Sequence, residues 1–381
     1  MEFPILSYIL LSPSVGVLIL FLVPDGKDNV VRWVSLAVSL VATFFAVWMF
    51  MAYDRANPNF QFEEIYAWVP GLNSSYHVAV DGVGATLVLL NAIVMLTGVV
   101  TSWTINFRVK EYFILFLLLV AGVFGSFICL DFLLFFIFFE VAVLPMYLLI
   151  GIWGSTNREY AALKLTIMLL AGSGLVFVGL IMVYFTSTAH TFDFVTLRDT
   201  GFTSGFQDIV YPLMFLGFGT LAAVFPLHNW SPDGHVAAPT AVSMLHAGVL
   251  MKLGAYGVLR YGIELFPHGA ETWAPVAALL AASGVVYGAL PSYRSFAALN
   301  ERNSTVAALR WSGLRYTLRL DIASPSGSRV VGQTTISSGK FRSRTICRMT
   351  AACWASFCPK YALCGWTALN NLATTVVTPR K

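Results

Sequence analysis

The chain has 381 residues, of which 57% are hydrophobic and only 11% are charged, and its formal net charge is +4. Soluble globular domains carry about 25% charged residues, so this balance excludes an ordinary soluble protein. Apolar segments of about 20 residues recur along the chain, which suits membrane-spanning helices, whereas barrel strands are about half as long. The sequence therefore predicts an all-α, polytopic transmembrane helical bundle.

Nine apolar segments are expected to span the membrane. The first is too long for the core of a signal peptide and has no basic region before it, so we expect it to remain as a span. The nine segments are 4–23, 30–53, 83–103, 112–130, 132–153, 161–185, 209–227, 239–263 and 273–290. The two long connections, 54–82 and 186–208, carry aromatic and charged residues, and interfacial hairpins or helices are expected there.

Basic residues near the ends of the spans gather in alternate connections. The first, third and fifth loops contain Lys27, Arg32, Arg108, Lys110 and Arg158, whereas the opposite side has only Arg55 and Arg198. The positive-inside tendency then places the first loop in the cytoplasm and the N-terminus outside.

Two prolines predict local breaks in spans. Pro145 cannot donate to the carbonyl of Val141, and Pro226 similarly frees the carbonyl of Ala222. Freed backbone is tolerated at membrane depth where it lines a cavity, and broken helices recur in ion-moving membrane proteins. The alternative at Pro145 is a simple packing kink.

The connection after the seventh span also carries polar residues. Pro232, Asp233 and Gly234 indicate a turn. Asp233 and His235 could guard a solvent entrance, or they could make ordinary loop hydrogen bonds. Asp131, just before the fifth span, is expected to be a solvated helix end or a cap.

The composition changes near Leu290. Residues 1–290 carry 10 basic and 17 acidic residues, whereas 291–381 carry 13 basic and 2 acidic residues. This tail is rich in Ser, Thr and Arg and has no apolar run long enough for another span. It is either a basic segment that binds anionic lipid or the product of a shifted reading frame.

Cysteine spacing and nucleotide motifs argue against a cofactor on this chain. The tail has four cysteines but no CxxC pair, so no metal site is expected; they are Cys347, Cys353, Cys358 and Cys364. Neither a G-x-G-x-x-G nor a Walker A sequence is present. Any redox cofactor is therefore expected in another protein.

Charges within the spans carry the functional prediction. Glu140 is the only Asp, Glu, Lys, Arg or His in 132–153. A charge at bilayer depth costs roughly 2.5–3.5 kcal/mol, so it persists mainly where it faces water or a partner. Lys252 lies near the centre of the eighth span, and Lys164 lies near the start of the sixth, where snorkelling is the alternative.

These charges predict a path for protons. Burial lowers the proton affinity of a lysine, and a nearby carboxylate restores it, so a Glu–Lys pair couples the position of one charge to the protonation of the other. His228 and His246 could extend the relay because imidazole titrates near neutral pH, although a lone histidine in a helix more often only packs. His228 is the preferred candidate of the two.

Three runs of sequence resemble a known family. They are FFEVAVLPMYLLIGIWG at 138–154, REYAALKL at 158–165, and FPLHNWSPDGHVAAPTAVSMLHAGVLMKLGAYGVLRY at 225–261. These runs resemble subunit M of bacterial respiratory complex I, the NADH:quinone oxidoreductase, whose mitochondrial counterpart is subunit 4. The sister subunits L and N and the multisubunit sodium/proton antiporters share the broken helix and the buried lysine.

The resemblance implies an antiporter-like fold with about nine spans in this chain and a broken seventh helix. Its expected parts are helices 1–3 in 1–110, a five-helix repeat in 111–263, the start of a second repeat in 264–290, and the tail 291–381. Glu140, Lys164 and Lys252 match the charges of the fifth, sixth and eighth helices of the family.

The resemblance also implies a function and a location. The chain is expected to be a proton-translocating, multi-pass subunit of the bacterial plasma membrane that assembles with other membrane subunits of complex I. It is expected to hold no cofactor and to contact neither nucleic acid nor NADH, because FMN, iron–sulfur clusters and quinone belong to partner subunits. A cation/proton antiporter subunit and a non-conducting copy are the alternatives.

Two departures from the family matter. The lysine that the family usually has four residues before the Phe-Pro pair is replaced by Leu221, so Glu140 lacks its usual partner. Lys164 or a chain of waters could substitute for it. The second repeat is also incomplete, which is typical of a truncated or frameshifted copy.

Overall fold

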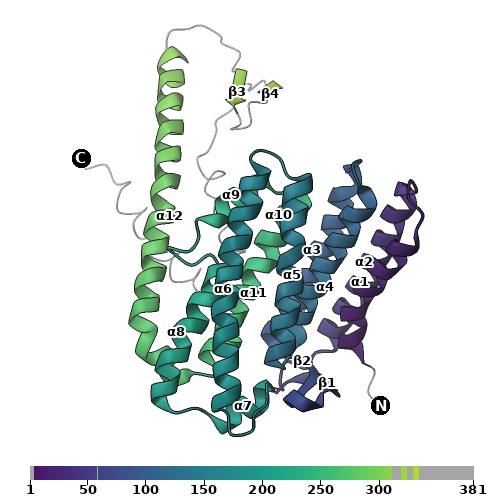
Figure 1. The fold of residues 1–381 in the computed structure, drawn as a ribbon. Helices are drawn as coiled ribbons and strands as arrows, with labels where there is room; N and C mark the ends of the chain where they lie inside the picture. Colours follow the sequence, from purple (N-terminus) through teal and green to yellow (C-terminus); the bar gives the residue numbers. More distant parts are fainter. Residues whose placement is uncertain (1–3, 58, 311–318, 324–328, 334–381) are drawn as a thin grey trace. The chain divides into compact units, whose positions relative to one another are not determined.

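The structure, a computed structural model, describes residues 4–57, 59–310, 319–323 and 329–333, with side chains described up to residue 289 (Figure 1). The chain divides into two compact units, Met1–Glu301 and Arg302–Lys381. The second unit contains one described antiparallel hairpin, formed by β3 (Arg319–Ala323) and β4 (Arg329–Gln333).

The first unit is built on long helices. They are α1 (Ile5–Leu22), α2 (Asp28–Ala52), α3 (Gly82–Thr101), α4 (Val109–Ile128), α5 (Phe132–Trp153) and α6 (Arg158–Thr186). Their length and apolar composition follow from the segments identified in the sequence. α4 is the most buried of them, and it packs against α1, α3 and α5.

Most of the helices that follow α6 are shorter, whereas the last of them has 44 residues. They are α7 (Phe194–Thr200), α8 (Ser204–Leu221), α9 (Trp230–Ala237), α10 (Thr240–Leu245), α11 (Met251–Gly257) and α12 (Pro267–Arg310). Two π-helical segments, η3 (His246–Leu250) and η4 (Val258–Ile263), join α10 and α11 into one eighth span. π-Helical turns inside helices often mark functional positions.

The long connection before α3 folds as a β-hairpin. Strands β1 (Gln61–Val69) and β2 (Ser74–Val80) pair antiparallel through the 3₁₀ turn η1 (Pro70–Leu72), with Ile65 opposite His77. Figure 1 shows this hairpin and α7 at the same end of the helices as the N-terminus. We call it the hairpin end. A hairpin or a helix was expected in each long connection, and the structure has a hairpin in the first and α7 in the second.

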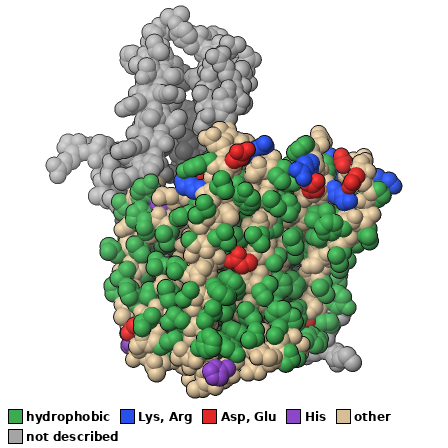
Figure 2. All heavy atoms as spheres, in the orientation of Figure 1, with side chains coloured by type: hydrophobic (Ala, Val, Ile, Leu, Met, Phe, Trp, Pro, Cys, Tyr) green, Lys and Arg blue, Asp and Glu red, His purple; other side chains and the backbone are tan. Residues whose placement is uncertain are grey.

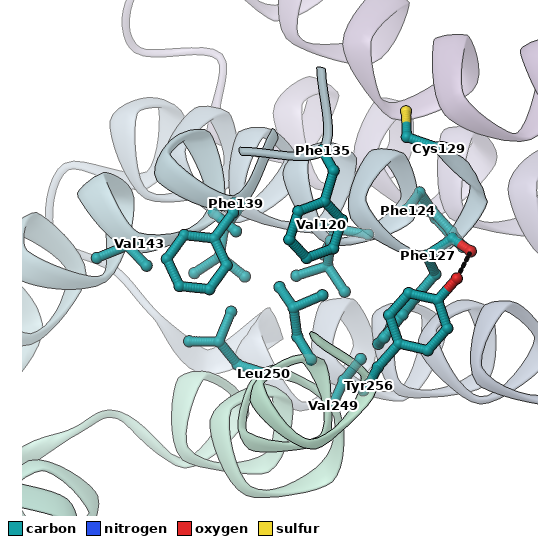
Figure 3. Close-up of a cluster of buried hydrophobic side chains, with 14 of the residues drawn as sticks. Val120, Phe124, Phe127, Cys129, Phe135, Phe139, Val143, Val249, Leu250 and Tyr256 are labelled. Carbon is teal, nitrogen blue, oxygen red and sulfur yellow. Dashed lines mark hydrogen bonds between the residues drawn. The ribbon is translucent and has the colours of Figure 1, made fainter. Parts of the chain in front are cut away.

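Close approach of helices replaces the hydrophobic effect as the cause of packing, because lipid is as apolar as the core. A Cβ atom on Gly122 of α4 would lie 2.6 Å from the backbone nitrogen of Ala142, so α5 lies directly on this glycine. Figure 3 shows the resulting core, in which side chains of α4 and α5 meet those of the eighth span. Phe135, Phe139 and Leu250 are fully or almost fully buried there.

Eight described helices are long and apolar enough to cross a membrane, compared with nine expected segments. The difference is the seventh segment: α8 ends at Leu221 and the next helix begins only at Trp230, so the helical path is broken around Pro226, as its sequence predicted. Pro145 does not produce the second expected break, because α5 continues through it as one helix. The break at Pro145 was therefore a wrong prediction, and the packing alternative describes it better.

Three further expectations change. Residues 232–234 lie within helix α9 and form no separate turn. Asp131 is fully buried and caps α5 by accepting from the Leu134 amide at 2.9 Å, so it is a cap but is not solvated. The last apolar segment belongs to a helix that continues past Leu290 to Arg310. The four tail cysteines lie outside the described residues.

Candidate functional site

Glu140 lies on α5 within the apolar belt of the helices. Its neighbours on the same helical face, Ile137 and Leu144, are 38% and 56% exposed, so this face points away from the core. Figure 2 shows one acidic group inside a belt that is otherwise apolar on this face. Glu140 itself is partly buried, and its Oε1 atom is buried without a hydrogen-bond partner.

Ser173 of α6 lies near the Glu140 carboxyl group, and its hydroxyl donates to the carbonyl of Leu170 at 3.2 Å. In the described part of the chain Glu140 takes part in no ion pair. The lysine that the family places in the broken helix is replaced by Leu221, which is buried at the end of α8. Lys164 was one of the substitutes that the sequence left open, and in this structure it pairs with Asp233 instead.

Lys164 joins α6 to the short helix after the break. Its Nζ atom lies 2.6 Å from Oδ2 of Asp233 on α9, and it also lies over the Tyr160 ring at 5.6 Å from the centroid. The two side chains are 28% and 43% exposed. The sequence left two roles open for Asp233, guarding a solvent entrance or making ordinary loop hydrogen bonds. In the structure it is the ion-pair partner of Lys164.

The break itself contains His228. Its ring packs against Phe225 at 5.5 Å and against Tyr287 of α12 at 5.1 Å between centroids. Its Nδ1 atom is buried and has no hydrogen-bond partner among the described residues. An imidazole with a buried, unsatisfied nitrogen is a site for a bound water or a proton.

His246 lies at the start of the first π-helical segment and is completely buried. It stacks on Trp230 at 5.1 Å and on His235 at 4.4 Å between centroids. Neither of its ring nitrogens has a hydrogen-bond partner in the described structure. His235 in turn shares a hydrogen bond of 3.1 Å with the hydroxyl of Ser243.

Lys252 lies on α11 between the two π-helical segments. Its ammonium donates to the carbonyl of Ala247, which lies one turn earlier in the first π-helical segment. A π-helical turn leaves such a carbonyl available because the regular helical ladder is interrupted. The lysine is half-buried, so it is held inside the bundle by backbone of its own helix.

These contacts connect some of the predicted residues and separate others. Asp233 and His235 lie on α9, and the second of them stacks on His246, six residues before Lys252. Lys164 contacts the same short helix through Asp233, two residues before His235, whereas Glu140 lies apart on α5. We call the set Lys164, Asp233, His235, His246 and Lys252 the polar row.

The sequence predictions favoured His228 over His246 and did not place Asp233 with Lys164. An available signal was the spacing of Asp233, His235 and His246, two and then eleven residues apart, after the broken helix. That spacing alone does not show that α9 folds back against the eighth span.

A second group of ionisable residues lies outside the spans, at the hairpin end. His77 of β2 is buried, with Nδ1 at 2.5 Å from Asp193 and Nε2 at 2.8 Å from Glu63. Burial lowers the pKa of His77, but the hydrogen bonds and charges of the two carboxylates outweigh it and raise the pKa overall. Burial raises the pKa of Asp193, yet His77 and Thr196 together bring it below its ordinary value.

Comparison with known proteins agrees with this geometry. Residues 129–297 match the family described as NADH:quinone oxidoreductase/Mrp antiporter, transmembrane. The chain is 37% identical over 294 residues to chain 4 2 of the NAD(P)H-quinone oxidoreductase of Microcystis aeruginosa, covering 77% of this chain and 53% of that protein. It is 37% identical over 303 residues to NADH-quinone oxidoreductase subunit M of Rhodobacter capsulatus, covering 75% and 58%.

Solved structures give the same fold. A chain of respiratory complex I from Thermus thermophilus superposes with a TM-score of 0.63 at 23% identity, covering 72% of this chain and 56% of that one. A chain of a membrane-bound sulfane sulfur reductase, an archaeal respiratory complex, gives a TM-score of 0.62 at 20% identity, with the same coverage. The chain thus spans a little over half the length of these relatives. By its sequence matches and its antiporter-like bundle, the chain is similar to members of the NADH:quinone oxidoreductase/Mrp antiporter transmembrane family.

Proposed function

We propose that this chain acts as a proton-translocating membrane subunit of a NADH:quinone oxidoreductase. The observation that carries the proposal is the polar row, which leads from the partly exposed Lys164–Asp233 pair to the buried His246 and Lys252. Charges and imidazoles inside an apolar bundle are costly and mark proton or ion routes. The redox chemistry belongs to partner subunits, which would hold the FMN, iron–sulfur clusters and quinone.

Glu140 has a different role in this proposal. It faces outward from α5, so a neighbouring membrane subunit can approach its carboxyl group, whereas the polar row lies inside this chain. A carboxylate that changes its charge at this position would act on the next subunit and on the helices behind it.

The proposed setting is the bacterial plasma membrane, with the hairpin end and the N-terminus outside. Support comes from the basic residues Lys27, Arg108 and Lys110, which lie at the opposite end of the helices from the hairpin. Lys110 binds the Val23 carbonyl at 2.8 Å and Asp25 at 3.1 Å, so the first and third loops meet there. Cytoplasmic loops carry an excess of such residues.

A pull-down of the tagged chain from its native membrane tests the assignment to complex I. We expect co-purification of subunits that contain flavin and iron–sulfur clusters. Recovery of membrane subunits alone, with sodium-dependent proton flux, would instead favour the multisubunit antiporters that share this family.

Replacement of Glu140 tests the role of the buried charge. In membrane vesicles with the assembled complex, Glu140→Gln should abolish NADH-driven proton uptake while NADH oxidation by artificial acceptors continues. Glu159→Gln is a matched control, because Glu159 is an exposed acid in the first turn of α6. Unchanged proton stoichiometry in Glu140→Gln would reject the proposed role.

A further inference from the structure

A buried histidine at the hairpin end joins three segments and takes no part in the polar row. His77 is 4% exposed, and each of its ring nitrogens contacts a carboxylate, with Nδ1 at 2.5 Å from Asp193 and Nε2 at 2.8 Å from Glu63. Glu63 belongs to β1 and His77 to β2, whereas Asp193 ends the connector 187–193 between α6 and α7. The imidazole therefore lies between the hairpin and the segment that leaves α6.

The register of the hairpin places Glu63 on the same face as His77. The pairing of β1 with β2 shifts by one residue around Phe62, whose φ is 57°. An extra residue of this kind turns the side chains that follow it to the other face of the strand. Beyond the shift Ile65 lies opposite His77, so Glu63, two residues earlier, projects to the same face and reaches the ring diagonally.

The contacts at both nitrogens require a protonated ring. A neutral imidazole has one N–H donor and one lone pair, whereas an imidazolium donates from both nitrogens. The carboxylates of Glu63 and Asp193 only accept, so both contacts are hydrogen bonds only while His77 carries its second proton. Burial lowers the pKa of His77, and the two carboxylates raise it by more. Loss of the proton leaves one carboxylate facing a lone pair.

The ring lies where the hairpin, the start of α5 and the connector meet. The carbonyl of His77 accepts from the amide of Leu130 at 2.8 Å, and the amide of Phe132, the first residue of α5, donates to the carbonyl of Phe192 at 2.9 Å. Asp193 is also the N-terminal cap of α7. A change at the ring therefore acts on the ends of several helices.

Most of the other titratable and charged side chains on the surrounding elements have partners of their own. They are Glu64, Tyr66, Tyr76, Asp81, Cys129, Asp131, His190, Arg198, Asp199 and Arg260. Glu64 accepts from two amides at the start of α1, and Asp131 accepts from the amides of Ser75 and Leu134. In the described part of the chain, Asp193 and Glu63 are the ion-pair partners of the ring, so its proton depends on these two carboxylates.

We propose that this cluster is a pH-operated clasp: the proton on His77 fastens the hairpin to the connector 187–193, and its loss loosens the connector and the start of α5. In the orientation proposed above the hairpin end faces outside, where translocated protons are released, so acidity there would keep the clasp fastened. That consequence rests on the proposed function, whereas the clasp itself rests on the contacts of His77.

Hydrogen–deuterium exchange of the purified full chain in detergent, read by mass spectrometry, tests the clasp. Exchange is compared from about pH 5.5 to pH 9, after correction for the pH dependence of unprotected amides. Residues 129–132 and 192–194 should exchange at least about threefold faster at the alkaline end, because a neutral donor makes a weaker bond than a charged one. Residues 115–122, in the middle of α4, should stay protected throughout. Corrected exchange of 129–132 and 192–194 that does not change with pH overturns the proposal.

Two variants separate the proton from the packing of the ring. His77→Gln cannot carry the proton, so its exchange should be fast at every pH and show no transition. Glu63→Gln changes a half-exposed side chain, keeps the ring, and should move the transition to lower pH. His268→Gln, in the exposed first turn of α12, is the control and should keep the profile of the unaltered chain.

A transition that persists in His77→Gln, or that stays at the same pH in Glu63→Gln, overturns the clasp. If His77→Gln does not fold, Glu63→Gln decides alone. Because the exchange experiment needs neither NADH nor partner subunits, its failure would leave the result of the NADH-driven Glu140→Gln experiment unaffected.

Discussion

The ammonium of Lys164 lies 2.6 Å from the carboxylate of Asp233, and this contact ties the sixth helix to the short helix that follows the break. Both side chains are partly exposed, so the pair is accessible to water at this end of the polar row. An exposed ion pair contributes little to stability because solvent screens it. We therefore expect the pair to serve the proposed proton route rather than stability.

Asp233→Asn should therefore slow NADH-driven proton uptake severalfold while the thermal unfolding midpoint changes little. The amide still fits the site but cannot hold the ammonium of Lys164 by charge. Both quantities can be measured on the same membrane preparation, with Asp199→Asn as a control in the exposed helix α7. A lower unfolding midpoint with an unchanged rate of proton uptake per assembled complex would show that Asp233 acts in stability and would contradict its proposed role in proton uptake.

His77 predicts a pH dependence of stability at the hairpin end. Burial alone would lower the pKa of His77 in the folded protein. Asp193 and Glu63 have a larger opposite effect, so the pKa is raised overall. The stabilisation is therefore complete below the unfolded pKa of about 6.5 and is lost as pH rises through the raised folded pKa. The pKa of Asp193 is lowered in the folded protein. The stabilisation from its carboxylate is therefore complete above about pH 3.9 and is lost as the pH falls through the lowered pKa.

His77→Gln should accordingly be destabilising between about pH 4 and 6.5, by about 1.5–3 kcal/mol for the loss of a charge-assisted hydrogen bond. The difference from the unaltered chain should shrink as the pH is raised toward 9. Thermal unfolding in detergent across this range measures it. His190→Gln, an exposed histidine in the loop before α7, serves as the control. A difference that grows with pH would contradict the protonated state of His77.

Much of the fold follows from local sequence, and the exceptions have physical causes. Apolar runs of sufficient length predicted the long helices, and Pro226 predicted the division of the seventh. Pro145 did not break α5, because its apolar neighbours keep the helix packed on both sides of it. Pro232 lies in the first turn of α9, which begins at Trp230, and proline is favoured early in helices as well as in turns, so the turn signal of 232–234 concealed a helix.

The site was harder to predict than the fold. Lys252 was recognisable because a central lysine in a span is costly, and the structure keeps it inside the bundle. The partners of such charges depend on which helices meet, so neither Asp233 beside Lys164 nor the stack of His235 on His246 follows from spacing in the sequence.

The close contact between α11 and the end of α8 leaves no room for a side chain at position 254, two residues after Lys252. A Cβ atom at this position would lie 2.5 Å from the amide nitrogen of Ala222 and 2.7 Å from the carbonyl of Phe218, both on the backbone of α8. Gly254→Ala should therefore push α11 away from the end of α8 and cost about 1–3 kcal/mol. Gly248→Ala is the matched control, because its nearest neighbours are side-chain atoms of Val94 at 3.5 Å and beyond.

Thermal unfolding of the two glycine variants measures this difference, and the Gly248→Ala chain should unfold at or above the temperature of the unaltered protein because alanine favours helix. Equal midpoints for the two variants would contradict the close contact between α11 and α8. NADH-driven proton uptake should fall only in Gly254→Ala, since the displacement moves the helix that carries Lys252.

His246 separates stability from function most sharply. Its ring is completely buried between Trp230 and His235, and both of its nitrogens lack hydrogen-bond partners in the described structure. An unsatisfied buried polar group costs about 1–3 kcal/mol, so His246→Leu should raise the unfolding midpoint. The same change removes the imidazole from the polar row and should slow proton uptake severalfold. A leucine variant that is more stable and takes up protons at the normal rate would show that His246 only packs. A variant that is more stable but slower would support a role of His246 in proton transfer, retained at the expense of stability.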